Sequence, residues 1–271
     1  MSASSSGCNP ESNVGLPFLC KLEITETFCT SIRYYCNVAC YRRLARDGAK
    51  VCIAAKTADP HPKLPGTIYS AAEEIEAAGG IALPIMCDVR EDESVEKAVS
   101  MAASEFGGLD IVINNASAIN NSSLEDLPMR RFDLMNQVNA RGTYTTTRAA
   151  LPHLLKSKRA QVLMLSPPLN MDGRWFKMGG TGYTMAKYGM SMCVLGFSEE
   201  LKGRVGVNAL WPRTAIATAA IEMLAGKAGV AASRKPEIMA DTAQWVVTQD
   251  PAFSGNFLID DEVLTQRMGG T

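Results

Sequence analysis

Short apolar runs alternate with longer segments of helical pattern along most of this 271-residue chain, and this alternation limits the folds that it can adopt. Six apolar runs are bounded by polar or glycine-containing turns, at residues 51–55, 81–87, 111–114, 161–165, 205–211 and 256–259. Short strands that alternate with helices indicate βαβ units and a parallel sheet. We therefore predict an α/β fold, a single-domain Rossmann-like doubly wound parallel sheet.

Helices are expected between these strands, over residues 67–78, 91–106, 126–152 and 183–203. The first two end immediately before Gly-Gly pairs, which is typical of helix termination.

The composition excludes several classes of protein. With 46% hydrophobic and 20% charged residues, the chain can bury a large core in one domain. Basic and acidic residues number 27 and 28, with no basic block, so we expect neither nucleic-acid binding nor a polybasic membrane patch. No apolar run approaches the roughly 18 residues of a membrane span.

Metal binding is not expected either. The eight cysteines form no Cys-x-x-Cys pair, and the chain has only two histidines. Without a secretory signal, the cysteines are interpreted as reduced thiols in an intracellular compartment, with Cys52, Cys87 and Cys193 in the core.

Tyr183 and Lys187 are the centre of a candidate site for acid–base chemistry. They are four residues apart, so on a helix they share one face, and the ammonium lies near the phenol. A phenol with a pKa of about 10 needs such a neighbour to exchange protons near neutral pH. Ser166 follows the apolar run 161–165, so its hydroxyl is expected at the carboxyl end of a strand, where ligands bind in open α/β sheets.

Together with Asn139 and the run Asn114-Asn115-Ala116-Ser117, these residues resemble the asparagine–serine–tyrosine–lysine set of the short-chain dehydrogenase/reductase family. The resemblance covers most of the chain. It implies that Tyr183 donates and accepts the proton, and that Lys187 binds the nicotinamide ribose and lowers the tyrosine pKa. It further implies that Ser166 positions the substrate carbonyl and that Asn139 holds a water molecule in a proton relay.

The same resemblance implies that Asp88 contacts the adenine, and that Asn115 and Ala116 line the cofactor cleft. NAD-preferring enzymes usually place an acid after the second strand, where it binds the ribose 2′-hydroxyl. Here that position is Lys56, which favours the 2′-phosphate of NADP over NAD. The alternative is that Lys56 is an exposed lysine at the start of a loop.

The segment 167–182 contains four apolar residues that suit a lipid-like or steroid-like substrate, Met171, Trp175, Phe176 and Met178. The same side chains could equally form the core of a lid. The alanine- and glycine-rich segment 215–231 resembles the mobile lid of the family. Arg213 stands where most members have glycine.

The amino-terminal region departs from the family. The family's glycine-rich turn lets the main chain approach the pyrophosphate. Here its three glycines align with Ser31, Tyr35 and Asn37. A side chain in a left-handed conformation costs about 1–2 kcal/mol, and a tyrosine ring would also occupy space that the phosphates need.

The expected first strand, residues 24–30, would bury the unpaired charge of Glu26 in the sheet. Residues 1–20 are interpreted as a disordered tail, and 21–271 as the reductase-like domain with an atypical first βα unit. We hypothesise that residues 1–43 are an alternative or misassigned segment.

Two functions follow. The first is an NADP-dependent oxidoreductase that transfers hydride between nicotinamide and a carbonyl or secondary alcohol of an apolar substrate, with the chain expected to be a homo-oligomer. The alternative is a cofactor-free pseudoenzyme or assembly subunit, because the glycine-rich turn is missing. Cytoplasm is the default compartment, whereas the resemblance implies peroxisome or mitochondrion.

Overall fold

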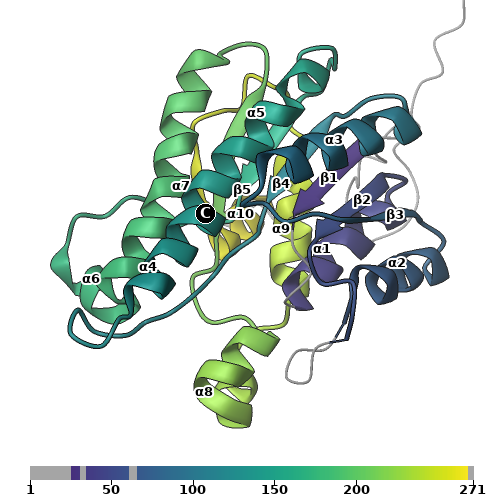
Figure 1. Cartoon of the computed structure of the whole chain (residues 1–271). Helices are drawn as coiled ribbons and strands as arrows, with labels where there is room; N and C mark the ends of the chain where they lie inside the picture. Colours follow the sequence, from purple (N-terminus) through teal and green to yellow (C-terminus); the bar gives the residue numbers. More distant parts are fainter. Residues whose placement is uncertain (1–25, 31–34, 61–65, 268–271) are drawn as a thin grey trace, which may run out of the picture.

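The structure is a computed structural model that describes residues 26–30, 35–60 and 66–267. Within these ranges, a seven-stranded parallel sheet of order β3-β2-β1-β4-β5-β6-β7 forms the centre of the molecule (Figure 1). The strands are β1 (Glu26–Thr30), β2 (Lys50–Ala55), β3 (Ile81–Met86), β4 (Ile111–Asn114), β5 (Gln161–Met164), β6 (Gly206–Trp211) and β7 (Phe257–Ile259). The predicted doubly wound parallel sheet is confirmed.

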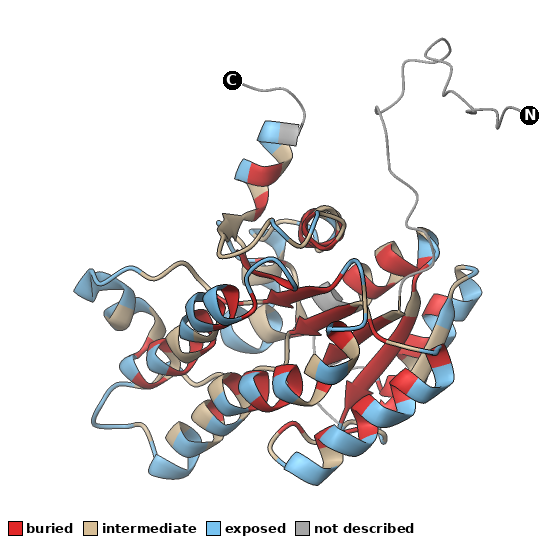
Figure 2. Cartoon of the chain, turned by 90° about the horizontal axis from the view of Figure 1, so that it is seen from above, coloured by how far each residue is buried: buried red, intermediate tan, exposed pale blue. Residues whose placement is uncertain are grey.

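Helices cover both faces of the sheet, which is red with buried residues in Figure 2. They are α1 (Tyr35–Arg46), α2 (Ile68–Ala77), α3 (Asp92–Phe106), α4 (Met129–Met135), a π-helical segment η1 (Asn136–Arg141), α5 (Gly142–Leu154), α6 (Gly173–Gly179), α7 (Thr181–Glu200), α8 (Ala219–Ala231), α9 (Glu237–Val247) and α10 (Asp260–Arg267). The core on one face is built with α1, α2 and α9, and the core on the other with α3, α5 and α7.

Six of the strands, β2 to β7, begin and end within one residue of the predicted positions. Strand β2 shows the reason. Val51 and Ile53 belong to one core, whereas Cys52 and Ala54 belong to the other. Because successive side chains of a strand point to opposite faces, a strand buried on both sides is a continuous apolar run. Of the thiols assigned to the core, those of Cys52 and Cys87 are buried, whereas Cys193 is partly exposed at its margin.

The single helix predicted over residues 126–152 is wrong in two respects. It begins at Met129, and the π-helical segment η1 interrupts it between α4 and α5. A π-helical turn widens the helix and redirects its side chains, and such turns are frequent at functional sites. The periodicity of apolar residues does not reveal one extra residue in a turn.

The prediction that Glu26 would be an unpaired buried charge is also wrong. Glu26 is the first residue of β1, where its carboxylate lies 3.4 Å from the Lys50 ammonium. Its main-chain N–H donates to Asp110, and burial together with that second carboxylate raises the pKa of Glu26. The charge of Glu26 is therefore compensated by Lys50 at the amino-terminal end of β1. The proposed tail, residues 1–20, and Ser31 lie outside the described residues.

Four helices were not anticipated as helices. They are α6 within the segment 167–182, α8 within 215–231, and α9 and α10 near the carboxyl end. Gly226 has a φ of 63° and kinks α8, a conformation that glycine adopts without strain. Its alanine and glycine content conceals the helical pattern, since alanine marks no apolar face.

Candidate active site

The carboxyl edge of the central strands is organised by Thr30 at the end of β1. Its hydroxyl accepts hydrogen bonds from the main-chain N–H groups of Asn115 and Ala116, at 3.1 and 3.2 Å, and donates to the carbonyl of Ile113. Strands β1 and β4 are neighbours where the strand order reverses, which is where open α/β sheets bind ligands. Asn115 and Ala116 thus lie at the predicted edge.

Asn139 lies in η1 and is wholly buried. Its amide forms a pair of hydrogen bonds with the peptide of Ala118, accepting from the N–H at 2.7 Å and donating to the carbonyl at 3.1 Å. Asn139 therefore fixes the loop that follows β4. Both bonds use the side-chain amide of Asn139. The role of holding a water molecule, predicted for Asn139, stays a prediction.

Tyr183 and Lys187 line one cavity, called here the Tyr183 cavity, at the amino-terminal part of α7. The cavity has a volume of about 460 Å³, within the usual range for small-molecule sites. Most of its other lining residues are apolar or aromatic, among them Pro167, Pro168, Trp175, Met178, Trp211 and Ile259. The structure thus places the predicted acid–base pair beside an apolar space.

Lys187 is buried, and its ammonium has three partners among the described residues, one of which is the Met190 sulfur at 3.5 Å. It donates to the main-chain carbonyl of Leu165 at 2.8 Å and lies 5.5 Å from the centre of the Trp211 ring. These neutral groups compensate the charge only in part, so burial lowers the pKa of Lys187 to about 7. Sequence reasoning missed Trp211, although its place at the carboxyl end of β6 is the signal that could have identified it.

Replacing Lys187 with methionine is expected to stabilise the fold at pH 6.5. Between pH 7 and 10.5 the unfolded lysine holds a proton that the folded one has lost, so wild-type stability rises with pH across that window. Below it the full penalty, up to about 5 kcal/mol, disfavours the native wild-type chain. Urea unfolding at pH 6.5 and 9 should show the variant's advantage shrink at the higher pH.

Lys202→Met is the matched control, because Lys202 is exposed and, among the residues that the structure describes, forms an ion pair only with Glu199. It should change the free energy of unfolding by less than about 0.5 kcal/mol at both pH values. A Lys187→Met variant that is destabilised equally at both would show that the charge carries no burial penalty.

Ser166 follows β5 and is wholly buried, and its hydroxyl has no hydrogen-bond partner among the described residues. An unpaired buried hydroxyl costs about 1–3 kcal/mol, so a bound water molecule or a ligand is the expected partner. The peptide before it belongs to Leu165, whose carbonyl binds Lys187. Ser166 is therefore one residue from the contact that anchors Lys187.

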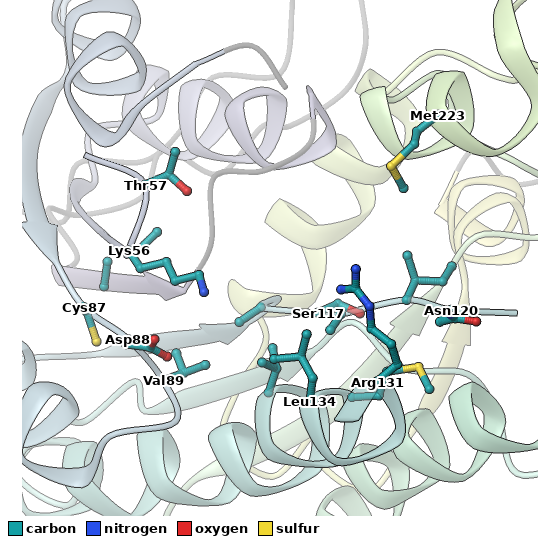
Figure 3. A pocket seen from close by; sticks show the side chains of 17 residues that line it. Lys56, Thr57, Cys87, Asp88, Val89, Ser117, Asn120, Arg131, Leu134 and Met223 are labelled. Atoms are coloured by element: carbon teal, nitrogen blue, oxygen red, sulfur yellow. The ribbon is translucent and has the colours of Figure 1, made fainter. Parts of the chain in front are cut away.

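A second cavity, the Lys56 cleft, lies at the ends of β2 and β3 (Figure 3). Lys56, Asp88 and Ala116 line it, so the structure brings these three predicted cofactor residues together. Asn115 lines neither cavity, and its side chain hydrogen-bonds the buried Tyr41. Five of the candidate residues are thus divided between two cavities at one edge of the sheet, whereas Ser166 and Asn139, like Asn115, line neither.

Asp88 is held in place by Arg90. The guanidinium donates to both carboxylate oxygens, at 2.9 and 2.5 Å, and the main-chain N–H of Arg90 donates to one of them. These hydrogen bonds lower the pKa of Asp88, and the nearby charge of Lys56 acts in the same direction. Asp88 is consequently an ionised, oriented acceptor.

Arg213, which stands where most family members have glycine, lines the Tyr183 cavity and pairs with Asp261 and Glu262. Next to it the wholly buried Asp260 accepts two hydrogen bonds from Arg234, at 2.7 and 2.9 Å, and one from the N–H of Arg213. Arg234 also bridges back to Ile216. These contacts join the two ends of the segment that carries α8 to each other and to the start of α10. They were not predicted from the sequence.

A model of the short chain dehydrogenase family matches residues 38–225, more than half of the chain. The chain belongs to this family. Its sequence is 57% identical over 222 residues to hydroxysteroid dehydrogenase-like protein 2 of Danio rerio, covering 82% of this chain and 53% of that protein. It is 52% identical over 251 residues to the Bos taurus protein of the same name, covering 93% and 60%. The chain thus spans little more than half the length of these relatives.

Solved structures agree with the family assignment. A putative dehydrogenase from Xanthomonas campestris has a TM-score of 0.85 and 50% identity, with 91% of both chains covered. A short-chain dehydrogenase from Mycobacterium thermoresistibile has a TM-score of 0.84 and 46% identity, with 89% of this chain and 86% of that one covered. This family consists of oxidoreductases that bind NAD(P) nucleotides. None of the described helices is both long enough and apolar enough to cross a membrane.

Proposed function

We propose that the chain is an NADP-dependent oxidoreductase that interconverts a carbonyl and a secondary alcohol on an apolar, lipid-like or steroid-like substrate. The observation that carries this proposal is the placement of Tyr183 and Lys187 on one face of α7, beside an apolar cavity. The unpaired hydroxyl of Ser166 supports it, because a substrate oxygen would supply the missing partner.

The cofactor's residues fit a dinucleotide. The Lys56 cleft offers a cation for a 2′-phosphate, the oriented carboxylate of Asp88 for the adenine, and the Ala116 edge of β4. Lys187 would hold the nicotinamide ribose. When bound, the nicotinamide supplies or accepts the hydride.

Chain residues manage the proton. In the reducing direction, the Tyr183 hydroxyl gives its proton to the carbonyl oxygen, and the Ser166 hydroxyl donates a hydrogen bond to the same oxygen. The positive charge of Lys187 favours the phenolate that remains. Asn139 keeps the loop after β4 in place through the peptide of Ala118, and in the proposed relay it also holds the water that returns the proton.

The test is a titration of the purified chain with NADPH and with NADH, followed by fluorescence or calorimetry. Lys56→Gln should weaken NADPH binding about tenfold and leave NADH binding unchanged, because only NADPH carries the 2′-phosphate. Lys97→Gln, an exposed lysine of α3, is the matched control and should change neither. Equal losses for both cofactors would contradict the assignment of Lys56.

The alternative, a cofactor-free pseudoenzyme, predicts that the wild-type chain binds neither cofactor. If the wild-type chain binds neither NADPH nor NADH at millimolar concentration, the missing glycines have removed cofactor binding. The relatives and structures reported above are named dehydrogenases, which favours the enzyme.

We also propose a homo-oligomer, formed through α5 and α7. Large apolar side chains are exposed on these helices, namely Tyr144, Met185, Met192 and Leu195. Exposed apolar side chains that gather on one face mark interaction surfaces. Sedimentation equilibrium tests this, and a monomer at micromolar concentration would contradict it.

For the compartment, we propose peroxisome or mitochondrion, as the resemblance implies. Imaging a tagged full-length chain against markers of both organelles tests this, and a diffuse cytoplasmic signal would overturn it.

A further inference from the structure

Arg131 lies near the start of α4 and points its guanidinium into the Lys56 cleft (Figure 3). The residue is exposed, and its side chain makes no hydrogen bond or ion pair with any residue that the structure describes. The labelled neighbours Ser117, Leu134 and Met223 are neutral. Arg131 thus presents an available cation to the cleft.

The charge of the cleft favours an anion. Lys56 lines one side and Arg131 another, and Asp88 is the one carboxylate among the described lining residues. Both oxygens of Asp88 are already bonded to Arg90. A cleft lined by an excess of positive charge concentrates anionic ligands.

The walls between these cations are mainly apolar. They include Ala54, Ala55, Val89, Ala116, Leu134 and Val138. Such a cleft suits an elongated ligand that has an apolar ring and negative charges at separate points. A dinucleotide has this pattern.

The phosphates need a partner in this chain. Where the family has glycines, the sequence has Ser31, Tyr35 and Asn37, so we expect the usual main-chain contact to a pyrophosphate to be weakened. We infer that Arg131 binds the pyrophosphate of the dinucleotide and so replaces part of that contact. A guanidinium suits this role because its planar fork can donate two parallel hydrogen bonds to one phosphate. The inference rests on the proposed function.

The test compares wild-type chain, Arg131→Gln and Arg130→Gln in titrations with NADPH and NADH. Arg131→Gln should weaken both cofactors by about the same factor, roughly tenfold, since both contain the pyrophosphate. Arg130→Gln is the matched control, because Arg130 is exposed on the same helix and does not line the cleft. Its affinities should equal those of the wild type.

Each outcome has a distinct meaning. A loss confined to NADPH would place Arg131 on the 2′-phosphate and overturn the inference, as would unchanged binding of both cofactors. Arg131→Lys should recover part of the loss, because it keeps the charge without the fork. A wild-type chain that binds neither cofactor would contradict the proposed function, and the inference would fall with it. Circular dichroism and thermal unfolding of the variants exclude a folding defect.

Discussion

Tyr183→Phe is expected to lower kcat for carbonyl reduction by about a thousandfold, because it removes only the hydroxyl that gives up the proton. General acid–base groups contribute roughly 10²–10⁴-fold to rate. The phenylalanine ring keeps the packing on α7, so the fold and the wall of the Tyr183 cavity should persist. The measurement is NADPH consumption with a panel of apolar ketones and aldehydes, chosen to fit that cavity.

The specificity of this effect can be checked with cofactor affinity. NADPH should bind Tyr183→Phe as tightly as the wild type, since the proposed contacts of the dinucleotide include Lys56, Arg131 and Lys187 but not the phenol. Tyr69→Phe is the matched control, because Tyr69 is an exposed residue of α2. Wild-type turnover by Tyr183→Phe would rule out the tyrosine as the acid.

The sheet could be predicted from the sequence because each strand is identified by an apolar run that lies within the strand itself. A strand buried on both faces, such as β2, requires five or six consecutive apolar residues, and the chain has few other such runs. The interruption of the helix by η1 could not be predicted in this way. This segment carries Asn139, whose side chain hydrogen-bonds the peptide of Ala118, 21 residues away, and a contact of that range leaves no local pattern.

The candidate site was predictable where its geometry follows from helix periodicity. The spacing of Tyr183 and Lys187 predicted that both lie on one face of a helix; both belong to α7 and line one cavity. Contacts between distant segments were not predictable. The Trp211 ring over Lys187 joins β6 to α7, and the Asp260–Arg234 pair joins α10 to the end of α8's segment.

Restoring the family's glycine-rich turn is expected to have the second large effect, on cofactor affinity. Changing Ser31, Tyr35 and Asn37 together to glycine should tighten NADPH binding by up to about a thousandfold, equivalent to about 4 kcal/mol. Glycine adopts left-handed backbone conformations at no steric cost, and it leaves room for the main chain to approach the phosphates. Calorimetric titration of the variant beside the wild type measures the difference.

Tyr35→Ala separates the two causes of this effect. Removing the ring without adding glycine should recover only the share of affinity that steric exclusion costs, whereas the triple variant also recovers the backbone conformation. If Tyr35→Ala equals the triple variant, then the ring alone limits binding. If the triple variant binds no better than the wild type, then the chain contacts the phosphates through other groups. In that case, the contribution of Arg131 should be as large in the triple variant as in the wild type, because the restored turn would have taken over none of its role.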